Sequence, residues 1–329
     1  MAANAPPPPQ PRALLLDGGT GHLLKEWGAR LPGLPLEQQF LAGAVANASD
    51  PALVRRAHAA YIAAGADVIT TNSFAATRHA LSRIGRAGDA AALAAAAARN
   101  AAGAREEAGA AGAGVLIAGS LPPLKESYQW EGLDPPDEMR AQYRELAEAL
   151  APHADVLLAE TLSTAAEAAA VAAATARLGK PLWVSFTLED STAARLRSGE
   201  LLAAAAAATA LLAAPHLEAL LINCCAPQAA SAALPALRAA APPRLRVGAY
   251  ANGFRTTTSQ WLAGGRAPEL EVDEADYDTA SGLITPAAYA RFAGAWARRG
   301  AALVGGCCGV GPEHIRAVAA ELSAPGRDV

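Results

Sequence analysis

Short runs of apolar residues recur along the chain, and each run ends at polar residues or at glycine. Eight runs have the length of a buried strand, at residues 13–16, 67–70, 115–118, 156–159, 182–186, 219–222, 245–249 and 301–304. Stretches long enough for a helix separate consecutive runs, and strands that alternate with helices indicate a parallel sheet. Eight such units in about 300 residues predict a single α/β domain, a closed (β/α)8 TIM barrel over residues 13–323.

Candidate helix starts support this alternation. Asp50 precedes Pro51 and Thr285 precedes Pro286, and a side-chain acceptor followed by proline is typical of a first helical turn. We expect helices at residues 51–64, 137–151, 164–178 and 286–299. A doubly wound open sheet is the alternative, and it would place a phosphate-binding glycine loop after the first strand. The Asp-Gly-Gly-Thr-Gly segment at 17–21 starts with an acid and lacks the G-x-G-x-x-G spacing, which favours the barrel.

The composition and net charge of the chain limit the kinds of molecule that it is expected to bind. The chain has 329 residues, of which 52% are hydrophobic, and its formal net charge is −4, so it can bury a full core. No basic stripe is present, which argues against nucleic acid and anionic membrane surfaces as partners. The long apolar segments are dominated by alanine and indicate outer helices rather than membrane spans. We expect small-molecule partners and a monomer or small homo-oligomer.

Both ends of the chain are expected to lie outside the barrel. Residues 1–12 are rich in proline and lack the apolar segment of a secretory signal, which predicts a disordered leader. Residues 324–329 are expected to form a short tail. Because no export signal is apparent, we expect a cytoplasmic protein whose cysteines stay reduced.

Polar side chains gather at the carboxyl ends of the predicted strands. In a barrel these ends form one rim, and that rim carries the active site. We expect the following residues there: Asp17, Thr71, Asn72, Ser73, Ser120, Glu160, Asn223, Cys224, Asn252, Cys307 and Cys308.

The four cysteines fall into two adjacent pairs, Cys224-Cys225 and Cys307-Cys308, each directly after a predicted strand. Only the seventh strand separates these two strand ends, so the pairs can meet at one ion. Neighbours along a strand face opposite sides, so only one of Cys224 and Cys225 should point into a site. Three thiolates leave one tetrahedral position open for a ligand, whereas a structural zinc site is closed by four protein ligands. Buried small residues without a metal are the plainer alternative.

Other residues at or near the rim have competing interpretations. Asp17 could act only as a turn former, and Glu160 could cap the following helix. Glu189-Asp190 is interpreted as part of a solvated loop. Four aromatic residues could face a cationic substrate or simply pack, namely Phe74, Trp130, Tyr250 and Phe254.

Six segments, taken together, resemble the zinc-dependent homocysteine S-methyltransferases. They are LDGG at 16–19, TTNSF at 70–74, AGS at 118–120, AET at 159–161, NC at 223–224 and GGCCG at 305–309. The segments follow the order of the family and span nearly the whole chain, and the NC and GGCCG pair is the more specific part. Leu221-Ile222 departs from the usual glycine-containing lead into the Asn-Cys pair, and Cys225 is an additional thiol beside it.

The resemblance implies roles for individual residues. It implies Zn2+ as the cofactor, with Cys224, Cys307 and Cys308 as its ligands. It also implies that Asp17 and Glu160 contact the amino group of homocysteine. The substrate carboxylate would then be bound near the following residues: Gly18, Gly19, Thr71, Asn72 and Ser73.

The implied reaction is transfer of a methyl group from S-methylmethionine, or another sulfonium, to L-homocysteine to give methionine. Alternatives keep the acceptor and use betaine, or a methylated cobalamin or folate partner, as donor; a non-catalytic zinc-binding barrel is a further alternative. The chain shows neither the long C-terminal extension of the betaine-dependent branch nor a cofactor module, which favours a small diffusible donor. We expect the loop at 122–138, after the third strand, to act as a lid that determines donor specificity.

Overall fold

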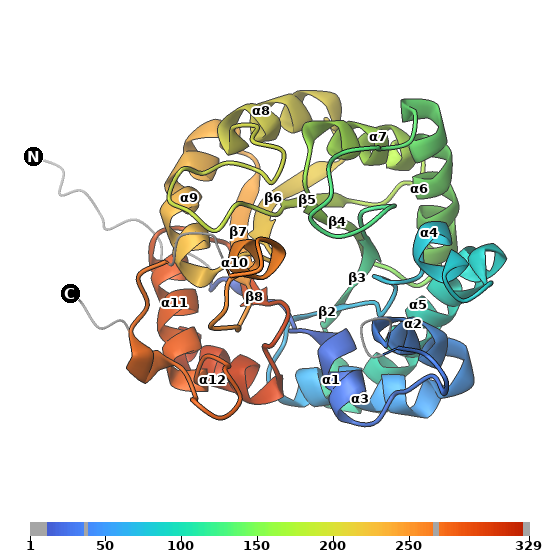
Figure 1. Ribbon diagram of the computed structural model, residues 1–329, viewed down its shortest axis with the longest axis horizontal. Helices are drawn as coiled ribbons and strands as arrows, with labels where there is room; N and C mark the ends of the chain where they lie inside the picture. Colours follow the sequence, from blue (N-terminus) through green and yellow to red (C-terminus); the bar gives the residue numbers. More distant parts are fainter. Residues whose placement is uncertain (1–11, 36–38, 266–269, 325–329) are drawn as a thin grey trace, which may run out of the picture.

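Eight parallel strands form one sheet in the computed structural model, which describes residues 12–35, 39–265 and 270–324 (Figure 1). The order of hydrogen-bonded neighbours is β1-β8-β7-β6-β5-β4-β3-β2. The barrel closes between β1 and β2, where Leu16 forms a bridge with Val68 and the Asp17 N–H donates to the Val68 carbonyl at 2.9 Å. The predicted TIM barrel is confirmed. The strands are β1 Leu14–Leu15, β2 Val68–Thr70, β3 Leu116–Leu121, β4 Val156–Leu162, β5 Leu182–Phe186, β6 Leu217–Asn223, β7 Arg246–Ala251 and β8 Leu303–Gly306.

Helices surround the barrel (Figure 1), and local sequence explains where several of them begin. The side chains of Asp50 and Thr285 accept hydrogen bonds from backbone N–H groups three residues ahead, as their positions before proline predict. The α-helices within the described residues are α1 Thr20–Glu26, α2 Phe40–Ser49, α3 Pro51–Ala63, α4 Arg78–Ser82, α5 Ala90–Glu107, α6 Pro136–Leu150, α7 Ala165–Thr175, α8 Leu202–Leu212, α9 Pro227–Ala240, α10 Thr258–Leu262, α11 Pro286–Arg298 and α12 Pro312–Ser323.

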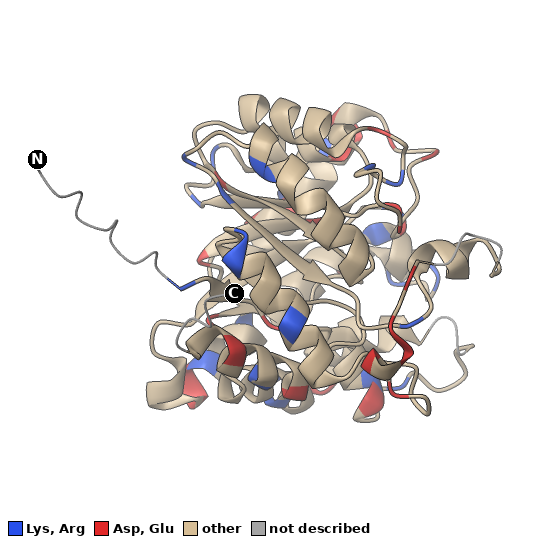
Figure 2. Ribbon diagram, turned by 90° about the vertical axis from the view of Figure 1, so that its left-hand side faces the viewer, with Lys and Arg blue, Asp and Glu red and all other residues tan. Residues whose placement is uncertain are grey.

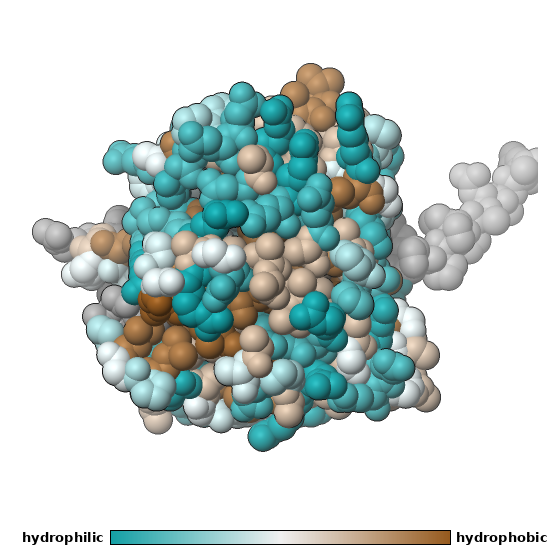
Figure 3. All heavy atoms as spheres, turned by 90° about the vertical axis from the view of Figure 1, so that its right-hand side faces the viewer, coloured by the Kyte–Doolittle hydropathy of each residue, from teal (hydrophilic) through white to brown (hydrophobic). Residues whose placement is uncertain are grey.

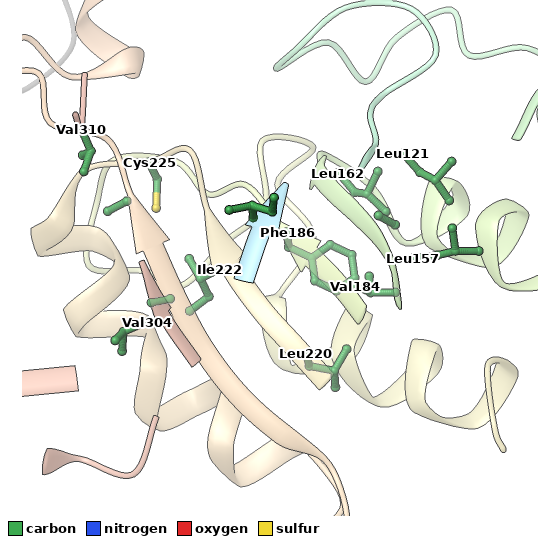
Figure 4. Packing of buried hydrophobic residues seen from close by; sticks show 14 of the residues in the cluster. Leu121, Leu157, Leu162, Val184, Phe186, Leu220, Ile222, Cys225, Val304 and Val310 are labelled. Carbon is green, nitrogen blue, oxygen red and sulfur yellow. The ribbon is translucent and has the colours of Figure 1, made fainter. Parts of the chain in front are cut away.

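Buried apolar side chains form two clusters. The smaller cluster contains Leu158 and Trp183 and fills the barrel interior. The larger one contains Leu157 and Ile222 and lies between the strands and the helices (Figure 4). Adjacent residues such as Leu157 and Leu158 belong to different clusters because successive strand residues face opposite sides. Charged residues lie mostly on the helices and loops, while the strands carry few of them (Figure 2).

Five strands end later than the apolar pattern predicts, namely β3, β4, β6, β7 and β8. The ends of β3, β4 and β6 include Ser120, Glu160 and Asn223, which we had expected just beyond the strands. Strand pairing uses backbone groups and therefore continues through polar side chains wherever the barrel buries them. Ser120 and Asn223 are thus held by regular strand pairing, whereas Glu160 lies where the pairing of β4 with β5 shifts register.

The predicted leader and tail lie outside the described residues, except for Arg12 and Ala324. Arg12 forms an ion pair with Asp67 at 2.7 Å. In the described part of the chain, no helix is long and apolar enough to cross a membrane. The surface facing the viewer in Figure 3 mixes hydrophilic and hydrophobic residues.

Candidate metal and substrate site

Three cysteine sulfurs meet at the carboxyl ends of β6 and β8. The Sγ atoms of Cys224, Cys307 and Cys308 all lie within 4.8 Å of one another, and those of Cys224 and Cys308 are 3.9 Å apart. Cys224 is the residue directly after β6, and Cys307 and Cys308 follow β8. Only β7 lies between these strands, which explains how two segments distant in sequence come together. The three sulfurs could serve as ligands of one metal ion.

The fourth cysteine faces away from this group. Cys225 is fully buried among the residues between strands and helices, with Ile222 and Val304 in the same cluster (Figure 4). Cys224 itself adopts a left-handed backbone conformation, with φ 55°, and such a conformation is rare for a residue with a side chain. This local bend turns the Cys224 sulfur toward Cys307 and Cys308 while Cys225 returns to the core.

Asn223 links the cysteine cluster to the neighbouring strands. Its side-chain oxygen accepts hydrogen bonds from the Thr161 N–H at 2.9 Å and the Ser185 hydroxyl at 2.7 Å. Its amide nitrogen donates to the Thr161 hydroxyl at 2.9 Å and lies 3.9 Å from the Cys307 sulfur. Thr161 also has a left-handed backbone, with φ 62°. Asn223 therefore fixes the ends of β4, β5 and β6 relative to one another beside the sulfurs.

A tyrosine from the loop between β3 and α6 covers the cluster. The Tyr128 hydroxyl lies 2.9 Å from the Cys224 sulfur. Burial raises the pKa of Tyr128 well above its ordinary value, and the charge at Cys224, Cys308 and Cys307 adds to this effect. Tyr128 lies in the loop expected to form a lid, whereas the aromatic residue of this loop that we expected near the substrate, Trp130, is 41% exposed. No local motif distinguishes one aromatic residue of this loop from the other.

Without a metal ion, the three thiols must share protons. Hydrogen bonds from Cys307 and Cys308 lower the pKa of the Cys224 thiol well below its ordinary value. Hydrogen bonds with Cys224 and Cys308 raise the pKa of the Cys307 thiol above its ordinary value, and burial adds to this effect. The hydrogen bonds thus favour a thiolate at Cys224, and a cation among the three sulfurs would favour the ionised form of each of them.

A buried carboxyl group lies on the neighbouring part of the rim. Glu160 accepts hydrogen bonds from the Ser120 hydroxyl at 2.5 Å and the Tyr250 hydroxyl at 3.1 Å. Burial raises its pKa to about 7, against the lowering effect of these two donors. The suggestion that Glu160 caps the following helix is wrong, because Thr164 and Glu167 form the cap of α7. Tyr250, considered as an aromatic partner for a cation, instead holds Glu160 with its hydroxyl.

Asp17 is the second buried carboxyl group, and its hydrogen bonds extend beyond its own turn. Its two oxygens accept from the Thr70 N–H at 2.7 Å and the Thr70 hydroxyl at 2.9 Å, across the seam between β1 and β2. Burial raises the pKa of Asp17 to about 8, and the charge of Glu160 also raises it. The two carboxyl groups are therefore close enough to interact, and a ligand ammonium group would stabilise the ionised form of both.

The glycines after Asp17 allow the first loop to approach the cysteine loop. A Cβ atom on Gly19 would lie 2.8 Å from the Cys307 carbonyl oxygen, and one on Gly18 would lie 2.1 Å from the Val310 carbonyl oxygen. Both distances are shorter than real side chains tolerate, so only glycine permits this approach. The Asp17 turn is consequently held directly against the segment that carries Cys307 and Cys308.

The segment after β2 is internally hydrogen-bonded. The hydroxyls of Thr71 and Ser73 lie 2.9 Å apart, and Ser73 donates to the Ser120 carbonyl at 2.8 Å. The Asn72 amide turns toward α2, where it donates to the Gly43 carbonyl at 2.7 Å. These side chains are thus held by hydrogen bonds to neighbouring parts of the rim.

The expectation of a solvated Glu189-Asp190 loop is wrong for Asp190. Its side chain is buried and forms an ion pair with Arg197 at 3.1 Å. Arg197 is seven residues away in sequence and lies on the other side of a loop, so no short sequence motif predicts this ion pair.

A sequence model of the homocysteine S-methyltransferase family matches residues 14–322. The chain belongs to the homocysteine S-methyltransferase family. This family's activity is methyl transfer to homocysteine, and the present protein is an enzyme of that class.

Individual relatives agree with the family assignment. Homocysteine S-methyltransferase 4 of Zea mays is 29% identical, and the match covers 93% of this chain and 88% of the maize protein. The metallated form of the homocysteine methyltransferase MmuM from Escherichia coli superposes with a TM-score of 0.74 at 28% identity, covering 94% and 96% of the two chains. The oxidized form of MmuM gives a TM-score of 0.73 at 29% identity over the same shares. A relative within this family therefore holds a metal, and the present chain has a three-cysteine cluster able to do so.

Proposed function

We propose that this enzyme transfers a methyl group from S-methylmethionine to L-homocysteine, with a zinc ion held by Cys224, Cys307 and Cys308. The observation that carries the proposal is the position of three cysteine sulfurs beside two buried carboxyl groups on one barrel rim. Sulfur ligands suit a metal that activates a thiol, and carboxylates suit the ammonium group of an amino acid. A substrate that fits both features has a thiol and an ammonium group, as an amino-acid thiol does.

The dimensions of the sulfur cluster support zinc. Tetrahedral zinc–thiolate bonds of about 2.3 Å place ligand sulfurs about 3.8 Å apart. The 3.9 Å separation of Cys224 and Cys308 is compatible with that value. When bound, the ion would keep a substrate thiol deprotonated at neutral pH. Cys225 lies in the outer core, so three ligands come from the cysteines and a position is left for substrate.

Glu160 and Asp17 would bind and orient the acceptor. Both are buried, and both would be ionised by the positive charge of the substrate ammonium group. The substrate carboxylate would be bound by backbone N–H groups of the loops after β1 and β2. For the amides of Gly18 and Asn72 the described residues provide no hydrogen-bond partner, whereas the Gly19 N–H already donates to Val310 and the Thr71 N–H to Ala118.

The residues around the sulfurs would align the donor and exclude water. Transfer from a sulfonium releases a neutral thioether, so the leaving group needs no general acid. Alignment of the acceptor sulfur, the methyl carbon and the donor sulfur is then the main requirement. The loop that carries Tyr128 lies over the cysteines and would close above the donor. Betaine and methylated cobalamin or folate remain the alternative donors that the test must compare.

Parallel assays of methionine formation test this proposal. The reduced, zinc-loaded protein is incubated with homocysteine and either S-methylmethionine, S-adenosylmethionine or betaine. We expect S-methylmethionine to be the fastest donor, S-adenosylmethionine to be slower and betaine to be negligible. The fastest rate with betaine, or a requirement for methylcobalamin or methyltetrahydrofolate, would contradict the assigned donor. Absence of bound metal in active protein would contradict the zinc assignment independently.

A further inference from the structure

A buried cation lies next to the cysteine cluster. Arg197 is only 4% exposed, in the connection between β5 and α8. This connection folds back on itself through an antiparallel bridge between Leu188 and Leu196, which places Arg197 above the barrel rim rather than in solvent. Arginine is rarely buried without a partner, so its contacts require an explanation.

Arg197 joins its own connection, between β5 and α8, to the start of α10. It donates to the Asp190 carboxylate at 3.1 Å and to the Ser259 hydroxyl of α10 at 2.6 Å. Asp190 in turn accepts from the Ala226 N–H at 2.6 Å and from the Ser259 N–H at 2.8 Å. Ala226 is two residues beyond Cys224. The ion pair therefore holds the backbone that follows Cys224 as well as two loops of the rim.

Stability alone does not account for this ion pair. Removing two charges from water is unfavourable, and a buried ion pair often stabilises a fold no more than apolar residues of the same size would. In addition, Arg197 Nε is buried, and the described residues offer it no hydrogen-bond partner. A buried donor without a partner lowers stability further. The arrangement is better explained by what the guanidinium group positions.

The guanidinium group contacts the tyrosine that covers the cysteines. Its central carbon lies 5.2 Å from the centre of the Tyr128 ring, within the range of a cation–π contact. The Tyr128 hydroxyl reaches the Cys224 sulfur at 2.9 Å. Tyr128 has φ 68°, a left-handed conformation that needs support from its surroundings. Arg197 thus contacts the Tyr128 ring, while its partner Asp190 binds the backbone just after Cys224. The ion pair therefore supports both Tyr128 and Cys224.

We propose that Arg197 is a positioning residue of the methyl-transfer site: held by Asp190 and Ser259, it fixes the Tyr128 ring so that the tyrosine hydroxyl covers Cys224. This deepens the proposed function, since it takes the three cysteines as the reacting site. Arg197 acts through Tyr128 and need not touch either substrate. A planar guanidinium group suits the task because it can donate hydrogen bonds at its edge and stack on a ring with its face.

Alkylation of Cys224 in the reduced, metal-free protein measures this covering directly. Cys224 is 3% exposed, so iodoacetamide can reach it only when the loop over it opens. Peptide mass mapping reports the labelling rate of each cysteine separately. We expect Arg197→Lys to accelerate labelling of Cys224 about tenfold, because lysine keeps the charge but loses the stacked, two-pronged geometry.

A double-mutant cycle with Tyr128 distinguishes an effect of Arg197 through the Tyr128 ring from a general increase in the mobility of the loops. If Arg197 acts through the ring, Arg197→Lys should change the rate less than about twofold when Tyr128→Ala is already present. In the Tyr128→Phe background, which keeps the ring, Arg197→Lys should still accelerate labelling. The same acceleration with and without the ring would overturn the proposal, as would no effect of Arg197→Lys in the parent protein.

Three controls accompany the cycle. Tyr143→Phe removes another tyrosine hydroxyl, one for which the described residues offer no partner, and Arg78→Lys alters an exposed ion pair with Glu145; neither should change labelling of Cys224. Cys225 reports global unfolding within the same sample, since it is fully buried. Equal acceleration at Cys225 and Cys224 in Arg197→Lys would count against the proposal. Because labelling needs neither metal nor substrate, its outcome is independent of whether zinc or the donor was assigned correctly.

Discussion

At the scale of single residues, side chains of the same type have different roles because they point in different directions and are buried differently. Cys224 and Cys225 differ by one position, yet one sulfur joins the cluster of three and the other lies among apolar side chains. Similarly, Asp17 and Glu160 are carboxyl groups that burial keeps partly protonated at neutral pH. Orientation and burial, rather than residue type, therefore determine what each group can bind.

Substitution at the cysteine pairs tests the ligand assignment. We expect Cys307→Ser to lose most of its bound zinc, because two thiolates are left and a serine hydroxyl is a poor zinc ligand. Cys225→Ala is the matched control and should retain about one ion per chain. Metal content of the purified, reduced proteins, measured by elemental mass spectrometry, distinguishes the two. Loss of zinc in Cys225→Ala but not in Cys224→Ala would mean that the first pair was assigned the wrong way round.

Glu160 should make the stability of the metal-free protein depend on pH. Its pKa of about 7 exceeds the ordinary value of 4.5, so between these values the folded state binds more protons than the unfolded state. The stabilisation is complete below pH 4.5 and is lost as the pH rises through 7, an effect of about 3 kcal/mol. In Glu160→Gln this contribution should be absent, leaving the loss that Asp17, with its pKa raised to about 8, still causes, as denaturant unfolding at several pH values would show. Parallel pH profiles for both proteins would contradict the burial argument.

The same variant should be selectively impaired with homocysteine. Losing a buried charged partner for the substrate ammonium group should reduce kcat/KM by about 30- to 1000-fold, equivalent to roughly 2–4 kcal/mol. A simple thiol without an amino group should be used almost equally well by both proteins. Equal impairment with both acceptors would assign Glu160 a structural role.

At the scale of elements, strand ends and the loops directly after β1 and β2 carry the groups proposed to bind the acceptor, and longer loops cover them. Ser120, Glu160 and Asn223 lie inside the last residues of β3, β4 and β6, whereas Tyr128 and Arg197 belong to connections above the rim. Rigid strand ends suit the fixed geometry of an amino-acid site, and loops suit a donor that must enter and leave. The acceptor and donor functions should therefore be separable by mutation.

Shortening the loop after β3 tests this separation. Removal of residues 124–133 should reduce use of the sulfonium donor far more than binding of homocysteine, because the groups proposed to bind the acceptor lie on strand ends and on the loops after β1 and β2, outside this segment. Isothermal titration with homocysteine and steady-state kinetics with varied donor would measure the two effects. A deletion that weakens homocysteine binding as much as donor use would place part of the acceptor site in this loop.

Sequence patterns were informative where the structure is local or periodic. The eight strands, the helix caps at Asp50 and Thr285 and the meeting of the two cysteine pairs all follow from alternation and strand order. The contacts of Tyr128 and Arg197 were not predicted, because they join loops whose relative positions depend on the whole barrel. Burial of Asp190 was missed for the same reason, since a carboxylate in a loop is usually solvated.

At the scale of the whole molecule, the barrel depends on a short seam. β1 has only two residues, Leu14–Leu15, and β2 has three, Val68–Thr70. The Asp17 carboxylate strengthens this closure by accepting two hydrogen bonds from Thr70. A residue proposed to bind the substrate thus also holds the barrel closed.

Asp17→Ala should therefore affect both properties. We expect the free energy of unfolding to fall by about 1–3 kcal/mol, because a buried N–H and hydroxyl lose their acceptor. Amide hydrogen exchange at Thr70 should accelerate, while exchange in β5 and β6, on the opposite side of the barrel, should change much less. Unchanged exchange at Thr70 would contradict the role in closure. Asp17→Asn keeps one acceptor oxygen and should restore part of the lost stability.

An ion bound at the sulfur cluster would also affect the stability of the fold. Cys224 and Cys308 are 84 residues apart, and an ion bound to both would act as a reversible cross-link around the segment from α9 to β8. Because such an ion binds the folded cluster and not the unfolded chain, it stabilises the fold by mass action, by about 4 kcal/mol when the free ion is at roughly 1,000 times its dissociation constant. Supply of the ion would then govern the lifetime of the folded enzyme as well as its activity. Chelation would leave the C-terminal third of the barrel as the part most easily opened.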